Sequence, residues 1–312
     1  MAKKNLIQFQ AGMSLPAFLQ SYGSEAQCRQ AVFEQRWPQG FFCPACGHRR
    51  YCQLHSRDLL QCNRCKHQTS LTRGTLFADT KLPLCTWFLA IYLLSQHKNG
   101  ISALALRRQL GVSYNTAWLI KHKLMQAMVE REASHQLSGD VQLDDAFWGG
   151  ERHGGGAGRG SPGKTPFVAA VQCSAQGHPV AMRLDVVAGF RKAELARWAS
   201  RYVAPGSRIV SDGLSCFPGV ALAGCHHTAI FNRGRRVPTE PALLWVNTLL
   251  GNIKNALHGT YHALRPKYLQ RYLSEFCYRF NRRFDLAALV PRLICAALHT
   301  PPLPYRIATL DV

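Results

Sequence analysis

Residues 141–150 read Val141-Gln142-Leu143-Asp144-Asp145-Ala146-Phe147-Trp148-Gly149-Gly150, and the rest of the chain is best understood around this stretch. Residues suited to a strand lead into two acids, two aromatic residues and a Gly-Gly break. A carboxylate inside a buried strand is costly, because desolvating an ionised group costs several kcal/mol unless a cation or hydrogen bonds compensate. We therefore expect Asp144 to mark a functional site, with Asp145 as a neighbour of lesser role.

A second acid ends a later strand, in Ser207-Arg208-Ile209-Val210-Ser211-Asp212-Gly213. Between the two acids, strands are predicted at 167–173 and 180–187 with the turn Gln176-Gly177 between them, and a helix is expected at 192–202. Three strands, a helix and a fourth strand are typical of a ribonuclease H-like mixed sheet with flanking helices. The Gly-rich stretch 149–163 lacks the spacing of a P-loop, so we expect a hairpin there.

Two carboxylates at the ends of neighbouring strands suit a divalent-metal site for phosphoryl transfer. Mg²⁺ prefers oxygen ligands, and a pair of such ions can activate the attacking oxygen and stabilise the leaving one. Asp144 and Asp212 therefore predict a site for Mg²⁺ or Mn²⁺. The alternative is that either Asp alone is a turn former at a strand end.

A third ligand for such a site usually comes from a helix, and residues 241–254 are the candidate. This helix has no acid after Glu240, which we expect to be exposed near the helix N-terminus. Asn247 and Lys254 lie two turns apart on one face, so both side chains could reach one site. Asn252 is the second choice.

Four cysteines predict a structural zinc site. Cys43 and Cys46 form one pair with a two-residue gap, and Cys62 and Cys65 repeat it. Two such pairs are the pattern of a tetrahedral four-thiolate zinc ribbon. A chance pairing of buried free thiols would rarely repeat the gap at both ends, and a ribbon indicates binding, not catalysis.

Residues 82–128 carry a helical pattern that predicts a helix-turn-helix-like DNA-binding region. A helix near 102–110 meets the turn Gly111-Val112-Ser113, and Ser113 is suited to cap the helix that follows. We expect polar residues of that last helix to contact DNA. They are Asn115, Thr116, Lys121 and Lys123. Any three-helix bundle would produce the same outline.

The composition of the chain favours a nucleic-acid partner. Its 312 residues include 38 Lys and Arg against 17 Asp and Glu, a formal charge of +21, and 47% apolar residues can supply real cores. The alternative is a merely soluble basic surface. No signal peptide is evident, and the longest apolar run, 87–94, is far below the roughly 20 residues of a membrane span. We expect a soluble cytoplasmic protein without a membrane partner, in which the 12 cysteines are read as metal ligands before disulfides.

The C-terminal part interleaves cations with aromatic residues, as on surfaces that follow a DNA backbone. We expect its cations to contact phosphates and most of its aromatic residues to pack in the core, with Glu275 as a partner for the cations. These predicted DNA-binding residues are Arg265, Lys267, Arg271, Arg279, Arg282 and Arg283.

Together these patterns predict an α+β or α/β chain of several domains. The expected divisions are a helical lead-in at 1–40, a zinc ribbon at 41–80, a helix-turn-helix-like region at 81–135, a ribonuclease H-like catalytic domain at 136–290 and a C-terminal tail at 291–312.

The motifs in combination resemble the transposases of the IS1595 group, also called ISXO2-like. Besides the two cysteine pairs and residues 143–150, the resemblance covers Gly74-Thr-Leu-Phe, Lys81-Leu-Pro-Leu, Ser211-Asp212-Gly213, Val246-Asn247-Thr248, Gly259-Thr-Tyr-His262 and Tyr278-Arg-Phe-Asn-Arg282. It implies a bacterial insertion-sequence transposase with an N-terminal zinc ribbon and a catalytic domain in which Asp144 and Asp212 are the first two metal-binding acids. Matching Lys254 to the family's helix lysine places Asn247 where the family commonly has an acid and some subgroups have Asn. Asp145 stands where the family often has Glu.

The resemblance implies metal-dependent end cleavage and strand transfer on double-stranded DNA. The partners would be terminal inverted repeats and target DNA, handled by a homo-oligomer at the bacterial nucleoid, because transposition engages two DNA ends. The main alternative is a decayed or domesticated transposase that only binds DNA, which the uncharged Asn247 favours. A ribbon-containing nuclease that cuts without joining is the third hypothesis.

Overall fold

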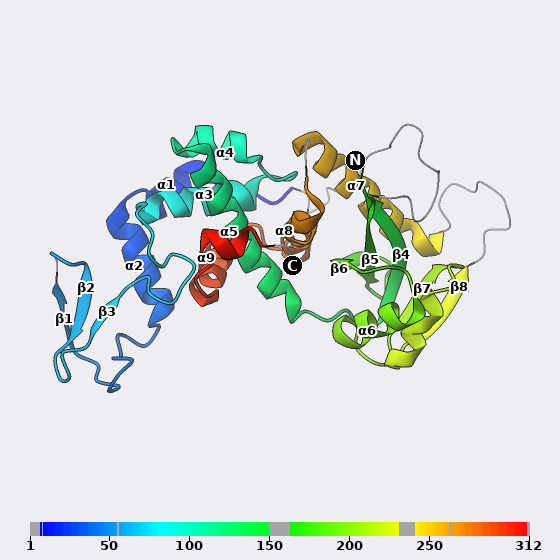
Figure 1. The fold of residues 1–312 in the computed structure, drawn as a ribbon, viewed down its shortest axis with the longest axis horizontal. Helices are drawn as coiled ribbons and strands as arrows, with labels where there is room; N and C mark the ends of the chain where they lie inside the picture. The colour runs from blue at the N-terminus through cyan, green and yellow to red at the C-terminus, as the bar shows by residue number, and fades with distance from the viewer. Residues whose placement is uncertain are drawn as a thin grey trace. The chain divides into compact units, whose positions relative to one another are not determined.

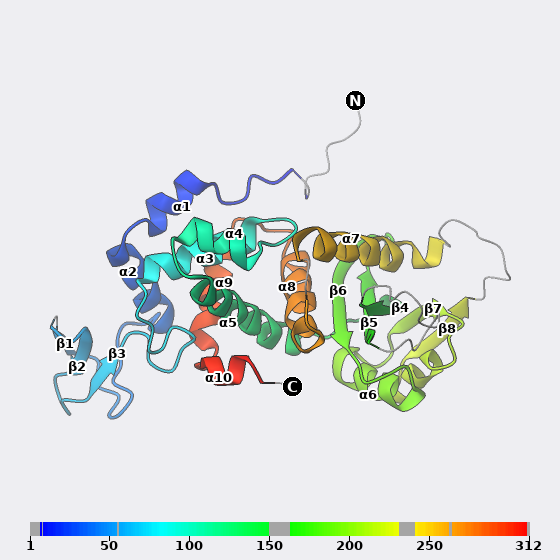
Figure 2. The ribbon, with the colours of Figure 1, turned by 45° about the horizontal axis from the view of Figure 1, so that its top comes forward.

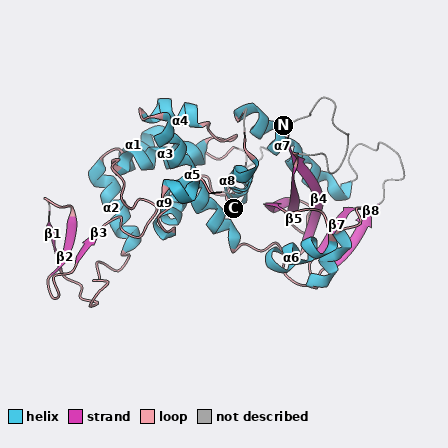
Figure 3. Ribbon diagram, viewed as in Figure 1, coloured by secondary structure: helices cyan, strands magenta, loops and turns pink. Residues whose placement is uncertain are grey.

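Two compact units make up the chain in the computed structural model, Met1–Met128 with Phe284–Asp311, and Val129–Arg283. The structure describes residue 7 and residues 9–54, 56–149, 163–230, 241–261 and 264–310. The predicted hairpin loop at 150–162 and Glu240 therefore lie outside the described residues. Figure 3 shows that each unit contains one sheet. Among the described helices none is both long and apolar enough to cross a membrane.

The first unit opens with two capped helices, α1 (Leu15–Tyr22) and α2 (Glu25–Arg36). Ser24 and Gln27 form a capping box at the start of α2, so the helix begins at a residue that the sequence specifies. The residues after α2 lead directly into the zinc ribbon.

The zinc ribbon is a three-stranded antiparallel sheet in the order β1-β2-β3. Its strands are β1 (Tyr51–Leu54), β2 (Leu59–Cys62) and β3 (Gln68–Ser70). Helix α2 packs on the ribbon, because Arg36 donates to the carbonyl of Leu71 at 2.6 Å and the Phe33 ring lies 5.8 Å from that of Tyr51. The predicted lead-in at 1–40 thus contains a helix that belongs structurally with the ribbon.

Helices complete the first unit. They are α3 (Leu84–Gln96), α4 (Ala103–Leu110), the part of α5 (Tyr114–Ala133) up to Met128, α9 (Leu289–His299) and α10 (Tyr305–Ala308). Ser113 caps α5 through a bond from the Thr116 amide, as the sequence predicts, and Gly111 ends α4 with a φ of 66°. The segment 291–312, predicted as a tail, instead contains most of α9, whose apolar residues are buried and which packs against α2 and α3.

A five-stranded mixed sheet forms the centre of the second unit, in the order β6-β5-β4-β7-β8 (Figure 1). Its strands are β4 (Asp140–Trp148), β5 (Thr165–Cys173), β6 (Pro179–Val186), β7 (Arg208–Asp212) and β8 (His226–Ile230). The first three pair antiparallel, and β7 and β8 run parallel to β4. This confirms the predicted ribonuclease H-like mixed sheet. It adds β8, a strand that the polar sequence of 226–230 did not reveal.

Helices cover both faces of this sheet, as Figure 2 shows for α7 on one face and α6 on the other. They are α6 (Lys192–Tyr202), α7 (Leu244–Thr260) and α8 (Leu269–Asn281), with short 3-10 turns at Phe217–Ala223, Pro241–Leu243 and Pro266–Tyr268. Strand side chains alternate between two apolar cores. One core contains Ala146 and the apolar faces of α7 and α8; the other contains Leu143 and α6. The unit ends at Arg283, close to but before the predicted boundary at 290.

Candidate catalytic and zinc sites

The two predicted acids lie opposite each other on the neighbouring strands β4 and β7. Strands β4 and β7 pair from Asp140 opposite Arg208 to Leu143 opposite Ser211, so Asp144 and Asp212 come next in register. Strand β7 ends at Asp212, whereas β4 continues to Trp148. Parallel strands deliver their carboxyl ends to one edge, where open α/β sheets bind ligands. The sheet thus brings both acids to a place where a substrate could be reached.

Asp145 joins this pair. One carboxylate oxygen from each of Asp144, Asp145 and Asp212 lies within 4.8 Å of the others, and all three residues are half-buried. The amide of Asp145 also donates to Asp144 Oδ1 at 2.8 Å. The sequence analysis gave Asp145 a lesser role, as a neighbour of Asp144. The only signal in the sequence was the Asp-Asp pair itself.

Helix α7 lies along β4 beside the acids. Gln142 Oε1 accepts from the amides of Trp245 and Val246, at 2.9 and 3.0 Å, and the Trp148 ring lies 4.7 Å from that of His258. Asp144 sits between these two anchors on β4. Because a helix rises about 1.5 Å and a strand about 3.3 Å per residue, the first turns of α7 run past Asp144.

Asn247 and Lys254 are both exposed on α7, away from its buried face. Their spacing places them on one side of the helix, as the sequence predicts. Asn252, the second choice, is exposed as well.

Neighbouring polar groups hold the end of β7 in place. The Leu214 amide donates to Asp212 Oδ1 at 3.2 Å, and the Ser211 hydroxyl lies 2.8 Å from His227 Nε2 on β8. Burial lowers the pKa of His227, which favours its neutral form. The carboxylate of Asp212 is therefore presented by a strand end that is fixed on two sides.

Three clustered carboxylates are a hard-oxygen donor set of the kind that Mg²⁺ and Mn²⁺ prefer. Like charges this close repel one another unless a cation compensates. The residues therefore fit a catalytic divalent metal.

The four cysteines converge as the spacing predicts. All four Sγ atoms lie within 4.8 Å of one another, with Cys43 and Cys65 at 3.5 Å and Cys46 and Cys62 at 3.7 Å. Burial opposes ionisation of Cys62, but hydrogen bonds from the amides of Cys65 and Arg64 more than offset it and lower its pKa to about 6. Thiolates in tetrahedral grouping are the donor set for structural zinc.

The structure places several predicted DNA-binding cations inside the protein. Lys121 is 1% exposed and its ammonium donates to the Ile101 carbonyl at 2.7 Å, so the prediction that it contacts DNA is wrong for this fold. Arg271 is buried, and burial lowers its pKa. Lys121 points inward because it lies on the buried face of helix α5.

Three further arginines at the end of α8 have internal partners. Arg279 pairs with Glu275 at 3.6 Å, and Arg282 pairs with Glu132. Arg283 donates to the carbonyl of Val180 at 3.0 Å, and burial lowers its pKa to about 10. These arginines therefore have partners within the second unit, and their phosphate contacts stay a prediction; the pairing of Glu275 with a cation agrees with expectation.

Other predicted DNA-binding residues remain accessible. Asn115 and Arg265 are exposed, and Lys267 is half-buried. Lys123 is also half-buried, with its ammonium 5.7 Å from the centre of the Trp87 ring. The Thr116 hydroxyl lies 2.8 Å from that of Ser113 and takes part in capping α5.

The zinc ribbon presents cations that sequence reasoning did not single out. Arg49, Arg50, Arg64 and Lys66 are exposed, and the Asn63 amide donates to the Arg50 carbonyl, so the two knuckles are adjacent. We call these four residues the ribbon cations. The sequence from 41 to 73 holds one acid, Asp58, which pairs with Arg29. The signal was the surplus of cations within the knuckles.

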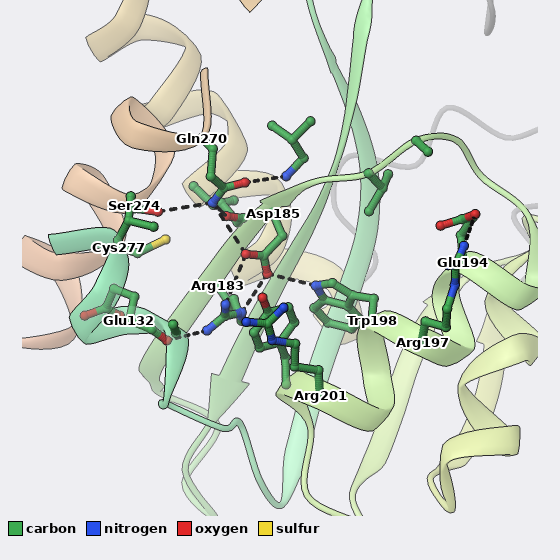
Figure 4. Close-up of a pocket in the computed structure, with 17 residues that line it drawn as sticks. Glu132, Arg183, Asp185, Glu194, Arg197, Trp198, Arg201, Gln270, Ser274 and Cys277 are labelled. Atoms are coloured by element: carbon green, nitrogen blue, oxygen red, sulfur yellow. Dashed lines mark hydrogen bonds and ion pairs between the residues drawn. The ribbon is translucent and has the colours of Figure 1, made fainter. Parts of the chain in front are cut away.

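A cavity of about 440 Å³ is lined by β6, α6, α8 and the end of α5, at the edge of the sheet away from the acids (Figure 4). Asp185 at its centre accepts from Arg183 at 2.6 Å and from the Trp198 indole at 2.8 Å. The Arg183 guanidinium lies 3.3 Å from the centre of the Tyr202 ring. Because these groups satisfy one another, the lining is a structural ion-pair network that joins β6 to α6.

Comparison with known proteins gives two domain matches. Residues 136–281 match the ISXO2-like transposase domain of the IS1595 group, and residues 23–68 match the transposase zinc-ribbon domain of the same group. The first match contains all three clustered acids, and the second contains all four cysteines and α2. They confirm the resemblance that the motifs indicated.

A curated relative supports the same assignment. A protein of Halobacterium salinarum, described as an uncharacterized protein in transposable element ISH50, is 25% identical over 132 residues. The aligned part covers 41% of this chain and 44% of the relative, so the chain matches less than half of the relative's length.

Proposed function

Because the chain belongs to the IS1595 family of ISXO2-like transposases, we propose that it cleaves the ends of an insertion sequence and joins them to target DNA in a metal-dependent reaction. One observation carries this proposal: Asp144 and Asp212 meet at the carboxyl end of β7, within the matched domain. Phosphoryl transfer on DNA needs groups that hold the reacting phosphate in line with the attacking oxygen. The carboxylates of Asp144 and Asp212 could hold metal ions that do this.

Asp144 and Asp212 would bind Mg²⁺ or Mn²⁺. Bound ions of this kind activate the attacking oxygen and stabilise the leaving one. In the first step water attacks the phosphorus at the element end, and the 3' oxygen leaves as a hydroxyl. In the second step that hydroxyl attacks a target phosphorus, and the target's own 3' oxygen leaves.

Asn247 and Lys254 would act from α7. The Lys254 ammonium would contact a DNA phosphate as a point charge, and the Asn247 amide would orient a ligand or the substrate. Both side chains are exposed, so DNA can reach them.

The DNA partners would be the terminal inverted repeats of the element and a target duplex. The ribbon cations, together with Asn115, Lys123, Arg265 and Lys267, are the groups best placed for this contact, because they are not fully buried. Handling two ends implies a homo-oligomer on DNA, and the site of action would be the bacterial nucleoid.

The test is a strand-transfer assay on terminal-repeat DNA with Mg²⁺ or Mn²⁺. Asp144→Asn and Asp212→Asn should abolish both cleavage and joining. Asp140→Asn is the matched control, since this exposed acid lies on the same strand and pairs with Arg208. Activity that survives in both site variants would refute the assignment, and cleavage without joined products would indicate a nuclease.

A decayed transposase that only binds DNA is the second candidate, and the neutral Asn247 favours it. The discriminating variant is Asn247→Glu. A silent wild type that this change activates would support decay, whereas an active wild type that Asn247→Ala impairs would support a native amide at this position.

A further inference from the structure

We propose that Asp145 supplies the third carboxylate of the metal site, in place of the acid that is absent at Asn247. The inference rests on the proposed function, since it concerns the same metal site. It assigns a ligand role to a residue that the motif comparison leaves as a neighbour of Asp144.

The position of Asp145 on the sheet is unusual for a ligand. Side chains on β4 alternate, so Asp144 points to the α7 face with Gln142 and Ala146, while Asp145 starts toward the α6 face with Leu143. Its carboxylate nevertheless lies within 4.8 Å of those of Asp144 and Asp212. The three acids therefore lie around the point where β7 ends. A cation bound there would receive carboxylates from both faces of the sheet.

The charge of the site also favours Asp145 as a metal ligand. Mg²⁺ and Ca²⁺ sites gain affinity with the number of charged ligands, and a neutral amide contributes less than a carboxylate. Asn247 offers an amide on an exposed part of α7. With Asp145, the site keeps three carboxylates even though α7 contributes none.

Three of the 17 acids of a chain with charge +21 lie in this one cluster. Like charges at this separation raise the free energy of the folded state. A divalent ion held among them reduces that repulsion.

Asp145 also has a positioning role through its backbone, whose amide donates to Asp144 Oδ1. This hydrogen bond is retained in Asp145→Asn, which changes only the charge of the side chain. The substitution therefore separates ligation by the carboxylate from positioning by the amide.

The experiment measures Mn²⁺ binding to the full-length, zinc-loaded protein by calorimetry and by electron paramagnetic resonance, without DNA. The variants are Asp145→Asn, Asp144→Asn, Asp212→Asn, the control Asp140→Asn, and the double variant Asp145→Asn/Asn247→Glu. Thermal melting without Mn²⁺ confirms that each variant is folded.

We expect Asp145→Asn to weaken Mn²⁺ binding by at least about tenfold, the loss that removing even an outer partner of a metal ligand causes. Asp140→Asn should bind as the wild type does. The double variant should regain most of the affinity, because it returns the missing carboxylate to α7.

Two results would overturn the inference in distinguishable ways. If Asp144→Asn and Asp212→Asn lose binding while Asp145→Asn binds as tightly as the wild type, the metal site stands and the role of Asp145 is wrong. If none of the three site variants changes Mn²⁺ binding, the metal site itself fails, and the proposed function fails with it.

Discussion

Arg282→Ala is expected to destabilise the second unit without weakening DNA binding. Arg282 pairs with Glu132, whose other carboxylate oxygen accepts from the Asn281 amide at 2.7 Å. The guanidinium also lies 3.8 Å from the centre of the Tyr278 ring. The substitution would leave Glu132 as a buried carboxylate with a single neutral donor from α8.

The magnitude follows from how deeply the pair is buried. The side chain of Glu132 is 7% exposed and that of Arg282 is 22% exposed. Removing one partner of a fully buried pair costs about 3–5 kcal/mol, and partial solvation of Arg282 reduces this to about 2 kcal/mol. A change of that size shifts the folding equilibrium roughly 30-fold.

Hydrogen exchange and salt titration together provide the assay. Arg282→Ala should lower amide protection in β6 and α8 roughly 30-fold, while the dependence of DNA affinity on salt stays as in the wild type. Arg50→Ala is the matched variant. It should leave protection in these elements unchanged and reduce the slope of log affinity against log salt by about 0.9 for each phosphate that the arginine neutralises in the wild type.

The opposite pattern would refute the assignment of these cations. A stable Arg282→Ala protein with a reduced salt slope would mean that Arg282 faces DNA, as the sequence pattern alone predicted.

Three more outcomes are expected. Chelation of zinc, or Cys62→Ser, should abolish amide protection in β1–β3 while the five-stranded sheet keeps its protection, because thiolate ligation holds the ribbon; loss of protection in both would contradict this. The hydrogen bond from Arg208 holds the pKa of Asp140 below its ordinary value, so the pair's contribution to stability is present above that ordinary value and disappears as the pH falls through the folded pKa. Carbon NMR should therefore find the midpoint of Asp140 depressed, and Arg208→Gln should bring it back. Burial, with smaller effects from Glu25 and Cys85, raises the pKa of Cys28 to about 12, so iodoacetamide at pH 8 should modify the exposed Cys52 and spare Cys28.

The sequence could predict those features whose chemistry is written in local spacing. The two cysteine pairs indicated a common metal, and Asp144 and Asp212 each followed an apolar stretch of a predicted strand, so both sites could be placed before the fold was known. The succession of three strands, a helix and a fourth strand along the chain also followed from the sequence, with the helix expected at 192–202. Strand β8 escaped because its sequence, His226 to Ile230, has no apolar alternation.

Features that depend on distant partners could not be predicted in this way. Lys121 and Lys123 are two residues apart on α5, yet the first is buried against the Ile101 carbonyl and the second is half-buried. Arg282 finds its partner 150 positions earlier in the chain. An apolar helix such as α9 can pack on any apolar face, so nothing local shows that it returns to α2 and α3.

The uncharged Asn247 was the strongest reason to regard the chain as a decayed transposase, and the geometry of β4 weakens it. Decay removes selection for a metal site, so the three acids of the cluster need not be retained together. Three carboxylates within 4.8 Å are therefore easier to explain in a protein that still binds metal. The uncharged Asn247 on α7 and the carboxylate of Asp145 beside Asp144 therefore belong to one question, and the Asp145→Asn/Asn247→Glu variant tests them together.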